Sequence, residues 1–281
     1  MYKIIKKTDL APQVKKLVVE ANEIAYKARP GQFVVIVSKE SSERIPLTIA
    51  DFNPQEGTIT LIFQEIGFST RELGLLGPGD SIQHILGPLG QPTHIENFGT
   101  VICVGGGVGI AEIYPVVKAM KKAGNRVLGI IGARNEGLII LKEELRKLCD
   151  ELFITTDDGS LGKKGLVTDI LQDLFISVEK STHTLYPDRV YAVGPVVMMQ
   201  AVSNLTKMYN IKTIVSLNPI MVDATGMCGS CRVSVAGKVV FGCVDGPEFD
   251  GHQVDFEELK KRLNSFKEKE DSLKNINAKQ G

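Results

Sequence analysis

The chain changes its secondary-structure pattern near residue 100, and this change sets the class of fold. Before it, short apolar or alternating runs are separated by Gly, Pro and Asn residues, which is typical of antiparallel strands in a barrel. After it, buried-strand runs alternate with runs of helical periodicity, which predicts a parallel, doubly wound sheet. With 281 residues, the chain is long enough for these two units and a small appendage. We therefore expect a β-barrel plus an α/β domain, followed by a small loop-and-hairpin domain.

Turn residues and periodicity place the expected elements. In the barrel, strands are expected at Val14–Glu20, Gln32–Ser38, Ile45–Asp51 and Thr58–Glu65, with a short helix at Ser69–Leu75. In the α/β domain, strands are expected at Val101–Val104, Arg126–Ile131, Leu152–Thr155, Val190–Val193 and Thr213–Leu217. Helices are expected there at Ile110–Ala123, Leu141–Leu148, Leu166–Leu174 and Val196–Tyr209. A hairpin is expected at Arg232–Val235 and Lys238–Phe241, turning at Ala236 and Gly237.

These elements divide the chain into three domains and a tail. We expect the barrel in residues 1–98, the α/β domain in residues 99–221 and the small domain in residues 222–256. Residues 257–281 are highly charged, so we expect a solvated helix that frays into disorder. A helix that docks on a partner is the alternative for this tail.

The charges are balanced, which argues against two classes of partner. The chain has 33 Lys plus Arg and 33 Asp plus Glu, and its formal net charge is zero. This balance disfavours a nucleic-acid or anionic-membrane surface. The first residues lack the apolar core of a secretory signal, and the most apolar stretches are too short and Gly-rich to span a bilayer. We therefore expect a cytoplasmic protein that binds no membrane and no nucleic acid, in a compartment where thiols stay reduced.

Three of the five cysteines and one aspartate form a spaced motif in the third domain. Asp223, Cys228, Cys231 and Cys243 are separated by four, two and eleven residues. Apart from the aspartate in the first position, this spacing matches the plant-type pattern of cysteines that holds a [2Fe–2S] cluster. Thiolates suit iron–sulfur clusters, and a carboxylate, although harder, also binds iron. The motif predicts metal ligation by these four residues in a protein that moves electrons singly.

A zinc site is the alternative at this motif, because Cys-x2-Cys is also a zinc-knuckle spacing. A second Cys or His pair is missing and Asp is a rarer structural zinc ligand, so the cluster is favoured. Five cysteines in 281 residues do not make a secreted disulfide framework. The two cysteines outside the motif, Cys103 and Cys149, are expected to be small core residues.

A glycine-rich turn follows the first strand of the α/β domain and opens its first helix. In this context, backbone N–H groups and the positive end of the helix dipole face a pyrophosphate. The residues expected to bind a dinucleotide here are Gly105, Gly106, Gly107, Gly109 and Ile110. The alternative is a tight strand-to-helix turn that holds no ligand.

Asp157 follows the third strand of the α/β domain, at the edge where an open α/β sheet has its ligand crevice. Its carboxylate can accept a hydrogen bond from a ribose hydroxyl and would repel a 2′-phosphate. Lys163 and Lys164 nearby act in the opposite sense. An ordinary Asp-Gly turn at residues 158 and 159 explains the same sequence equally well.

A third candidate site begins the strand expected at 45–51. An Arg, a Pro-fixed backbone and a hydroxyl can together hold a phosphate and the edge of a flavin ring. The residues in question are Arg44, Pro46, Leu47 and Thr48. The alternative is ordinary strand sequence without a ligand.

Taken in order, the barrel, the glycine-rich dinucleotide fold and the C-terminal cluster loop resemble the ferredoxin reductase superfamily. Within it, residues 1 to about 255 are similar to the electron-transfer subunits of dihydroorotate dehydrogenases. They are still more similar to the small subunits of the electron-bifurcating transhydrogenases, the NADH-dependent reduced ferredoxin:NADP oxidoreductases, also named sulfide dehydrogenase β subunits. Asp223 favours this group, whose [2Fe–2S] site has one Asp and three Cys, over the dihydroorotate group, which has four Cys.

The resemblance implies FAD in the barrel and NAD(H) in the α/β domain. The family's Arg-Pro-Leu-Ser flavin motif corresponds to Ile45-Pro46-Leu47-Thr48, with its Arg displaced by one position to Arg44. The strand and turn that hold the flavin and its pyrophosphate correspond to Ile62-Phe63-Gln64 and Ser69-Thr70. The segment near the nicotinamide corresponds to Gly194, Pro195 and Met198, and Val193 stands where the family often has Cys.

The resemblance also implies a reaction and a partner. The flavin itself exchanges a hydride with NAD(H), so no side chain is expected to be catalytic. Single electrons then pass through the cluster to a larger subunit, which carries a second FAD and further iron–sulfur clusters and meets NADP(H) and ferredoxin. Two alternatives are the electron-transfer subunit of a dihydroorotate dehydrogenase and a subunit of a sulfide or polysulfide oxidoreductase. A zinc-stapled nucleotide-binding module without redox activity is the alternative from a different class.

Overall fold

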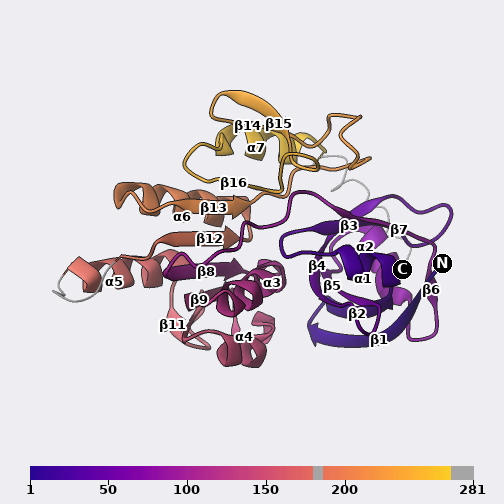
Figure 1. The fold of residues 1–281 in the computed structure, drawn as a ribbon, viewed down its shortest axis with the longest axis horizontal. Helices are drawn as coiled ribbons and strands as arrows, with labels where there is room; N and C mark the ends of the chain where they lie inside the picture. The colour runs from indigo at the N-terminus through magenta and orange to yellow at the C-terminus, as the bar shows by residue number, and fades with distance from the viewer. Residues whose placement is uncertain (180–185, 267–281) are drawn as a thin grey trace.

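The computed structural model describes residues 1–179 and 186–266, which form three parts (Figure 1). An antiparallel barrel and a parallel sheet with its helices lie side by side. The segment with the cysteine motif extends the edge of the sheet and packs against the barrel.

In the described residues, seven antiparallel strands form the near-closed barrel in the order β6-β1-β2-β5-β4-β3-β7. They are β1 (Tyr2–Ala11), β2 (Val14–Glu20), β3 (Phe33–Val37), β4 (Ile45–Asn53), β5 (Thr58–Gln64), β6 (Ser81–Ile82) and β7 (His84–Leu89). Two short helices, α1 (Asn22–Lys27) and α2 (Phe68–Leu75), follow β2 and β5. Fully buried side chains such as Leu17, Ile49 and Leu61 fill its core. The predicted barrel is confirmed.

The four strands and the helix predicted for the barrel are present within two residues of their expected bounds. Four other elements, β1, α1, β6 and β7, were not predicted. Only Ile4 of β1 is buried, so this strand lacks the alternation of apolar and polar residues by which strands are recognised. Its place in the barrel comes from its pairing with β2 and β6.

Five parallel strands form the centre of the second sheet, in the order β10-β9-β8-β12-β13. They are β8 (Thr100–Gly106), β9 (Arg126–Ala133), β10 (Glu151–Thr156), β12 (Arg189–Val193) and β13 (Thr213–Ser216). A two-residue strand, β11 (Lys163–Lys164), extends the sheet beyond β10. The strand order reverses at β8, which is where open α/β sheets have their ligand crevice. The predicted doubly wound sheet is confirmed.

Helices cover both faces of this sheet. α3 (Gly109–Lys122) and α4 (Lys142–Leu148) share one core with Val101 and Cys103 of β8. α5 (Val167–Glu179) and α6 (Val196–Met208) share the other core with Ile102 and Val104 of the same strand. A strand buried on both faces needs a continuous apolar run, which is what this stretch of sequence has. A short 3-10 helix, η1 (Glu136–Leu138), follows β9.

In the third part, the loop with Cys228 and Cys231 leads into the hairpin of β14 (Arg232–Val235) and β15 (Lys238–Phe241). Its turn is formed by Ala236 and Gly237, both with positive φ, as a two-residue turn of type I′ requires. This hairpin confirms the prediction residue for residue. The strand β16 (Glu248–Asp250), which was not predicted, pairs antiparallel with β13 and so joins this part to the sheet.

The start of the charged tail forms α7 (Phe256–Leu263) and a 3-10 helix, η2 (Asn264–Phe266). The carboxylate of Asp255 caps α7 by accepting a hydrogen bond from the Glu258 N–H. Leu259 is only 1% exposed and belongs to the core under α5 and α6. The expectation of a solvated helix is therefore wrong for this part of the tail, because α7 is amphipathic and buries one face. Residues 267–281 lie outside the described residues.

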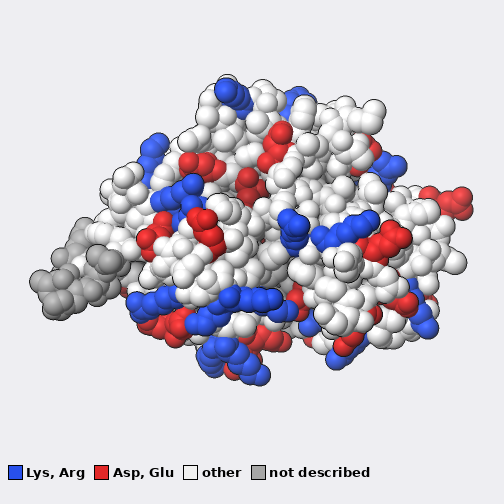
Figure 2. Space-filling view, in the orientation of Figure 1, with Lys and Arg blue, Asp and Glu red and all other residues white. Residues whose placement is uncertain are grey.

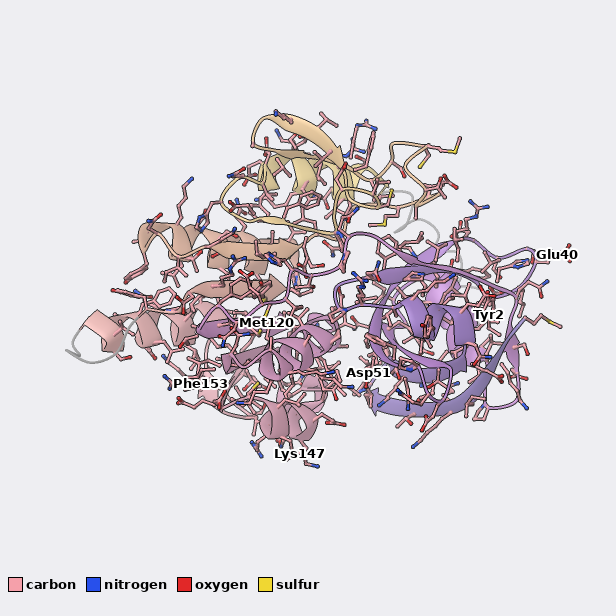
Figure 3. The ribbon with its side chains drawn as sticks, in the orientation of Figure 1. Tyr2, Glu40, Asp51, Met120, Lys147 and Phe153 are labelled. Carbon is pink, nitrogen blue, oxygen red and sulfur yellow. The ribbon has the colours of Figure 1, made fainter. Side chains whose placement is uncertain are left out.

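The barrel and the α/β domain are joined by shared packing. Val14, Ala50 and Ile62 of the barrel belong to the same core as Ile110 of α3. At the edge of this contact the Nζ of Lys118 lies 2.8 Å from Oδ1 of Asp51, which Figure 3 shows between the two domains. This packing fixes the orientation of the barrel relative to the α/β domain, and therefore the geometry of a site formed between the two domains.

The exposed surface mixes both signs of charge. Lys and Arg side chains are interspersed with Asp and Glu over the face in Figure 2, as the zero net charge predicts. Among the helices of residues 1–179 and 186–266, none is long and apolar enough to cross a membrane.

Candidate functional site

The glycine-rich turn between β8 and α3 has the backbone that its sequence predicted. Gly107 has φ of 57°, in the left-handed region that favours glycine, and a side chain there would meet no atom within 4 Å. Gly109 opens the helix so close to β12 that a Cβ would lie 2.4 Å from the carbonyl oxygen of Val193. The N–H groups of Ile110 and Ala111 donate to the carbonyls of Gly107 and Val108, so the turn suits an anionic group through the positive end of the helix dipole and the N–H of Gly109.

A cavity of about 700 Å³ lies in front of this turn, between the α/β domain and the barrel. Val14, Gln64 and Ile66 of the barrel form one wall. The residues of the cavity lining that the sequence had singled out are Gln64, Gly106, Gly107, Gly109, Asp157, Gly194, Pro195 and Met198. Residues that the sequence had assigned to the dinucleotide, and Gln64, which it had assigned to the flavin, thus line one cavity. The volume lies in the range of small-molecule and cofactor sites.

Two of the predicted dinucleotide residues lie behind the turn and outside the cavity lining. Ile110 is fully buried, and a Cβ on Gly105 would lie 2.9 Å from the Cα of Ile110. Gly105 therefore permits the close packing of helix on strand. Both residues shape the turn without offering a surface to a ligand.

Asp157 and Asp158 show both features that the sequence allowed here, a carboxylate available to a ligand and an ordinary Asp-Gly turn. Asp157 lines the cavity. Asp158 instead accepts hydrogen bonds from the N–H and the hydroxyl of Ser160, and these bonds hold its pKa below the usual value. The segment is therefore a turn that also presents one carboxylate to the cavity.

The predicted flavin residues lie on the barrel beside this cavity. Pro46, Leu47 and Thr48 are partly exposed on β4, and Gln64 ends β5 at the cavity wall. Phe63 is 2% exposed and belongs to the barrel core, so only its backbone is available to a ligand.

The two predicted residues on α2 are held by local hydrogen bonds. The Ser69 hydroxyl donates to Oε2 of Glu43 over 3.0 Å. The Thr70 hydroxyl bonds the N–H and the carbonyl of Gly67, which fixes the start of the helix. In this arrangement both hydroxyls are already satisfied by the protein.

Glu112, in the first turn of α3, also lines the cavity, and sequence reasoning missed it. Burial raises the pKa of its carboxyl from 4.5 to about 7, although a hydrogen bond from Thr48 opposes the shift. An acidic residue in the first turn after a glycine-rich loop was the signal available in the sequence. Other unpredicted polar side chains of the cavity lining include Arg134, Thr155, Ser216 and Asn218.

Two of the predicted cluster ligands are adjacent. The sulfur atoms of Cys231 and Cys243 lie 3.2 Å apart, and both residues are buried. Burial and the neighbouring Cys231 raise the pKa of the Cys243 thiol to about 11. A bound metal ion displaces the proton of such a thiol, so the raised pKa does not prevent Cys243 from serving as a ligand.

Cys228 lies in a different environment, at the exposed side of the loop. Its sulfur is 3.1 Å from the Ser230 hydroxyl. This contact, with the backbone N–H groups of Ser230 and Asp223, lowers the pKa of the thiol to about 7. Hydrogen-bond donors aimed at a sulfur stabilise a thiolate, so the loop fits the ligands of an iron–sulfur cluster.

The Asp223 carboxylate contacts two side chains of other residues. Its Oδ1 accepts a hydrogen bond from Nη1 of Arg44 over 2.7 Å, and its Oδ2 contacts the Thr225 hydroxyl. As placed, no three His, Cys, Asp or Glu side chains within 1–179 and 186–266 converge on a common metal position. Ligation by all four predicted residues therefore requires that side chains in the loop rotate.

The cluster loop packs on the strand next to the flavin motif. Cys231 and Cys243 share a small core with Phe33 and Val35 of β3. Phe33 pairs with Thr48 across β3 and β4. One strand thus separates the predicted flavin residues from two of the predicted cluster ligands.

Comparisons with known proteins agree with this arrangement. The oxidoreductase NAD-binding domain model matches residues 103–204. The model for the iron–sulfur cluster binding domain of dihydroorotate dehydrogenase B matches residues 218–255. The second match favours the iron–sulfur cluster over the zinc site at the cysteine motif.

Two relatives cover nearly the whole chain. A Thermotoga maritima protein, named as a homologue of the electron transfer subunit of dihydroorotate dehydrogenase B (NAD(+)), is 46% identical over 267 residues. The match covers 95% of this chain and 92% of that protein. A chain in the structure of the NADH-dependent reduced ferredoxin-NADP oxidoreductase, described in terms of flavin-based electron bifurcation, has a TM-score of 0.89 and 45% identity. That match covers 96% of this chain and 95% of the other.

A more distant structure supports the fold alone. Phthalate dioxygenase reductase, which is 16% identical, superposes with a TM-score of 0.56 over 83% of this chain and 85% of its own. The expected order of a flavin-type barrel, a NAD-binding domain and an iron–sulfur domain is therefore confirmed. The chain belongs to the family of dihydroorotate dehydrogenase B electron-transfer subunits and their homologues, within the ferredoxin reductase-like oxidoreductases.

Proposed function

We propose that this chain passes electrons from NADH, through FAD held on the barrel, to a [2Fe–2S] cluster held by Asp223, Cys228, Cys231 and Cys243. The observation that carries the proposal is the continuity of the three sites. The dinucleotide cavity reaches the barrel at Gln64, and the flavin strand β4 lies beside β3, whose Phe33 packs with Cys231. Packed protein therefore connects the successive proposed sites.

The residues of the cavity bind and align the nicotinamide nucleotide. The turn at Gly107 and Gly109 brings the positive end of the α3 dipole to the pyrophosphate, and Gly194 and Pro195 form the wall where the nicotinamide would lie. A flavin held here would supply the link between two-electron hydride transfer and single-electron transfer. The chain's own contribution is alignment and the exclusion of water by the shared core around Ile110.

The barrel would hold the flavin through β4 and α2. Pro46 and Leu47 offer partly exposed strand backbone, and the Thr48 hydroxyl lies at the boundary with the α/β domain. The first turn of α2, which contains Ser69 and Thr70, would present the positive end of its helix dipole to the flavin's pyrophosphate, while the two hydroxyls keep their partners Glu43 and Gly67.

The electrons then leave for a larger partner subunit. The loop that holds Cys228 is exposed and is flanked by the apolar side chains of Val222, Met227 and Val244, which are 59%, 88% and 41% exposed. Exposed apolar side chains around a redox loop support a protein interface at this place. We propose that the partner carries a second FAD and further iron–sulfur clusters, and that ferredoxin reacts with the partner and not with this chain.

The enzyme we favour is an NADH-dependent reduced ferredoxin:NADP+ oxidoreductase. The high coverage of the match to that enzyme and the aspartate at position 223 support this assignment. The second candidate is the electron-transfer subunit of a dihydroorotate dehydrogenase, which the name of the Thermotoga maritima relative favours. Purification of the chain with its partner distinguishes the two, because the second candidate predicts a partner that oxidises dihydroorotate.

We place this function in the cytoplasm. All five cysteines are free thiols, including Cys231 and Cys243, whose sulfurs are within contact distance. Thiols stay reduced, and iron–sulfur ligands stay available, in a reducing compartment.

The test is the content of iron, acid-labile sulfide and flavin per chain, in protein purified without oxygen. The proposal predicts two irons, two sulfides and one FAD, and bleaching of the visible spectrum when NADH is added. Zinc without flavin would contradict it. If flavin is present without iron, anaerobic reconstitution with iron and sulfide should restore the cluster, and failure to do so would remove the cluster from the proposal.

A further inference from the structure

Arg44 has a partner that its sequence position does not predict. It precedes β4 in the barrel, yet its Nη1 lies 2.7 Å from Oδ1 of Asp223, which is 179 positions further along the chain. Among the described residues, Asp223 is the carboxylate with which Arg44 forms an ion pair. The guanidinium therefore connects the barrel to the cluster loop.

The backbone beside Asp223 is fixed independently of this pair. Ala224 has φ of 59°, which is unfavourable for a residue with a Cβ, and it is only 3% exposed. Its burial against Phe33 and Val35 of β3 holds it in this conformation. The loop thus brings Asp223 to the barrel, and the Arg44 side chain then determines which way the carboxylate faces.

We propose that Arg44 is a positioning residue for the cluster, which orients the Asp223 carboxylate as an iron ligand and offsets negative charge on the reduced cluster. The inference rests on the proposed function, in which Asp223 occupies the first ligand position. A carboxylate has two equivalent oxygens and rotates freely. The guanidinium holds Oδ1 by a charged contact, whereas Oδ2 contacts only the neutral Thr225 hydroxyl, so Oδ2 is the oxygen that an iron would take over.

The charge argument gives the direction of the effect on the midpoint potential. Reduction adds one negative charge to a cluster that is already anionic. A guanidinium in contact with one of its ligands stabilises the reduced form more than the oxidised form, and so raises the potential. The side chains of Arg44 and Asp223 are 55% and 25% exposed, so salt weakens the effect without abolishing it.

The experiment compares four proteins purified without oxygen: the wild type, Arg44→Gln, Arg44→Lys and the control Arg126→Gln. Arg126 makes an ion pair of the same length, 2.7 Å, with Glu151 at the edge of β9, and its side chain is similarly exposed at 53%. The measurements are the cluster's midpoint potential, its EPR spectrum and the iron retained after gel filtration. Circular dichroism confirms that each variant is folded, which the exposure of Arg44 leads us to expect.

Arg44→Gln is expected to lower the potential, alter the EPR spectrum and lose iron faster than the wild type. Arg44→Lys, which keeps the charge but not the planar fork, should restore most of the potential and less of the spectrum. Arg126→Gln should match the wild type in all three. If the cluster of Arg44→Gln kept the wild-type potential, spectrum and iron retention, the inference would be overturned while the proposed function would stand. A wild-type protein that holds no iron after reconstitution would overturn the proposed function and the inference together.

Discussion

Thr48 on β4 of the barrel donates a hydrogen bond of 3.2 Å to Oε2 of Glu112 on α3 of the α/β domain. The bond crosses the boundary between the two domains, beside the cavity that Glu112 lines. Burial raises the pKa of this carboxyl to about 7, so near neutral pH it exchanges between its neutral and charged forms. A group in the proposed nicotinamide site is therefore sensitive to physiological pH.

The first prediction concerns stability against pH. In the unfolded chain Glu112 loses its proton near pH 4.5, whereas in the folded chain it keeps the proton up to about pH 7. Between these values the unfolded state binds fewer protons, so the free energy of unfolding falls as pH rises. Glu112→Gln cannot ionise and should be about 1–3 kcal/mol more stable than the wild type at pH 8, with little difference at pH 4.

Urea unfolding of wild type and Glu112→Gln across this pH range makes the comparison. Glu20→Gln, at an exposed end of β2, serves as the control and should follow the wild-type curve. Glu248 has a pKa raised to about 7 by burial, so the variant keeps part of the wild-type slope. If Glu112→Gln showed the full wild-type slope, the raised pKa would be refuted.

The fold was predictable where one local rule determines the element. The β14–β15 hairpin was correct in every residue, because a two-residue turn fixes the register of its strands. The apolar run of β8 and the helical periodicity of α3 were likewise decisive. β16 could not be found in this way, because its three residues form a strand only through pairing with β13.

The candidate site was predictable as motifs but not as contacts. The glycine turn and the cysteine spacing are local signals, and each keeps its meaning without the rest of the fold. The Thr48–Glu112 and Arg44–Asp223 pairs join residues 64 and 179 positions apart. Their members meet because the barrel packs against α3 and the cluster loop, and no spacing rule encodes that packing.

The second prediction replaces Asp223 by cysteine. Asp223→Cys should still assemble a cluster, now with four thiolates, and should differ from the wild type in both EPR spectrum and midpoint potential. Glu40→Cys adds a thiol at the outer edge of the barrel (Figure 3) and should change neither. An unchanged spectrum and potential in Asp223→Cys would show that Asp223 is not a ligand.

The third prediction separates dinucleotide binding from backbone strain. Gly107 and Gly237 both have positive φ, 57° and 73°, and a Cβ on either would meet no atom within 4 Å. Alanine at either position should cost about 1–2 kcal/mol of stability. Only the methyl group of Gly107→Ala enters the cavity, so only this variant should weaken NADH binding, by about tenfold or more. Urea unfolding and calorimetric titration measure the two effects, and equal NADH affinity in both variants would place the dinucleotide elsewhere.

The last prediction tests whether the start of the charged tail is part of the folded core. Leu259 of α7 is 1% exposed and packs in the core that also contains Phe175 and Met199, whereas Leu75 at the end of α2 is 80% exposed. Truncating a buried leucine removes its burial and leaves a cavity, so Leu259→Ala should lose about 2–5 kcal/mol of stability. Leu75→Ala should change it by no more than about 0.5 kcal/mol.

Because the Nη2 of Arg262 on α7 also donates to the carbonyl of Ser230 over 3.0 Å, Leu259→Ala should in addition release iron faster. A loss of stability without faster iron release would show that α7 supports the sheet but not the cluster loop.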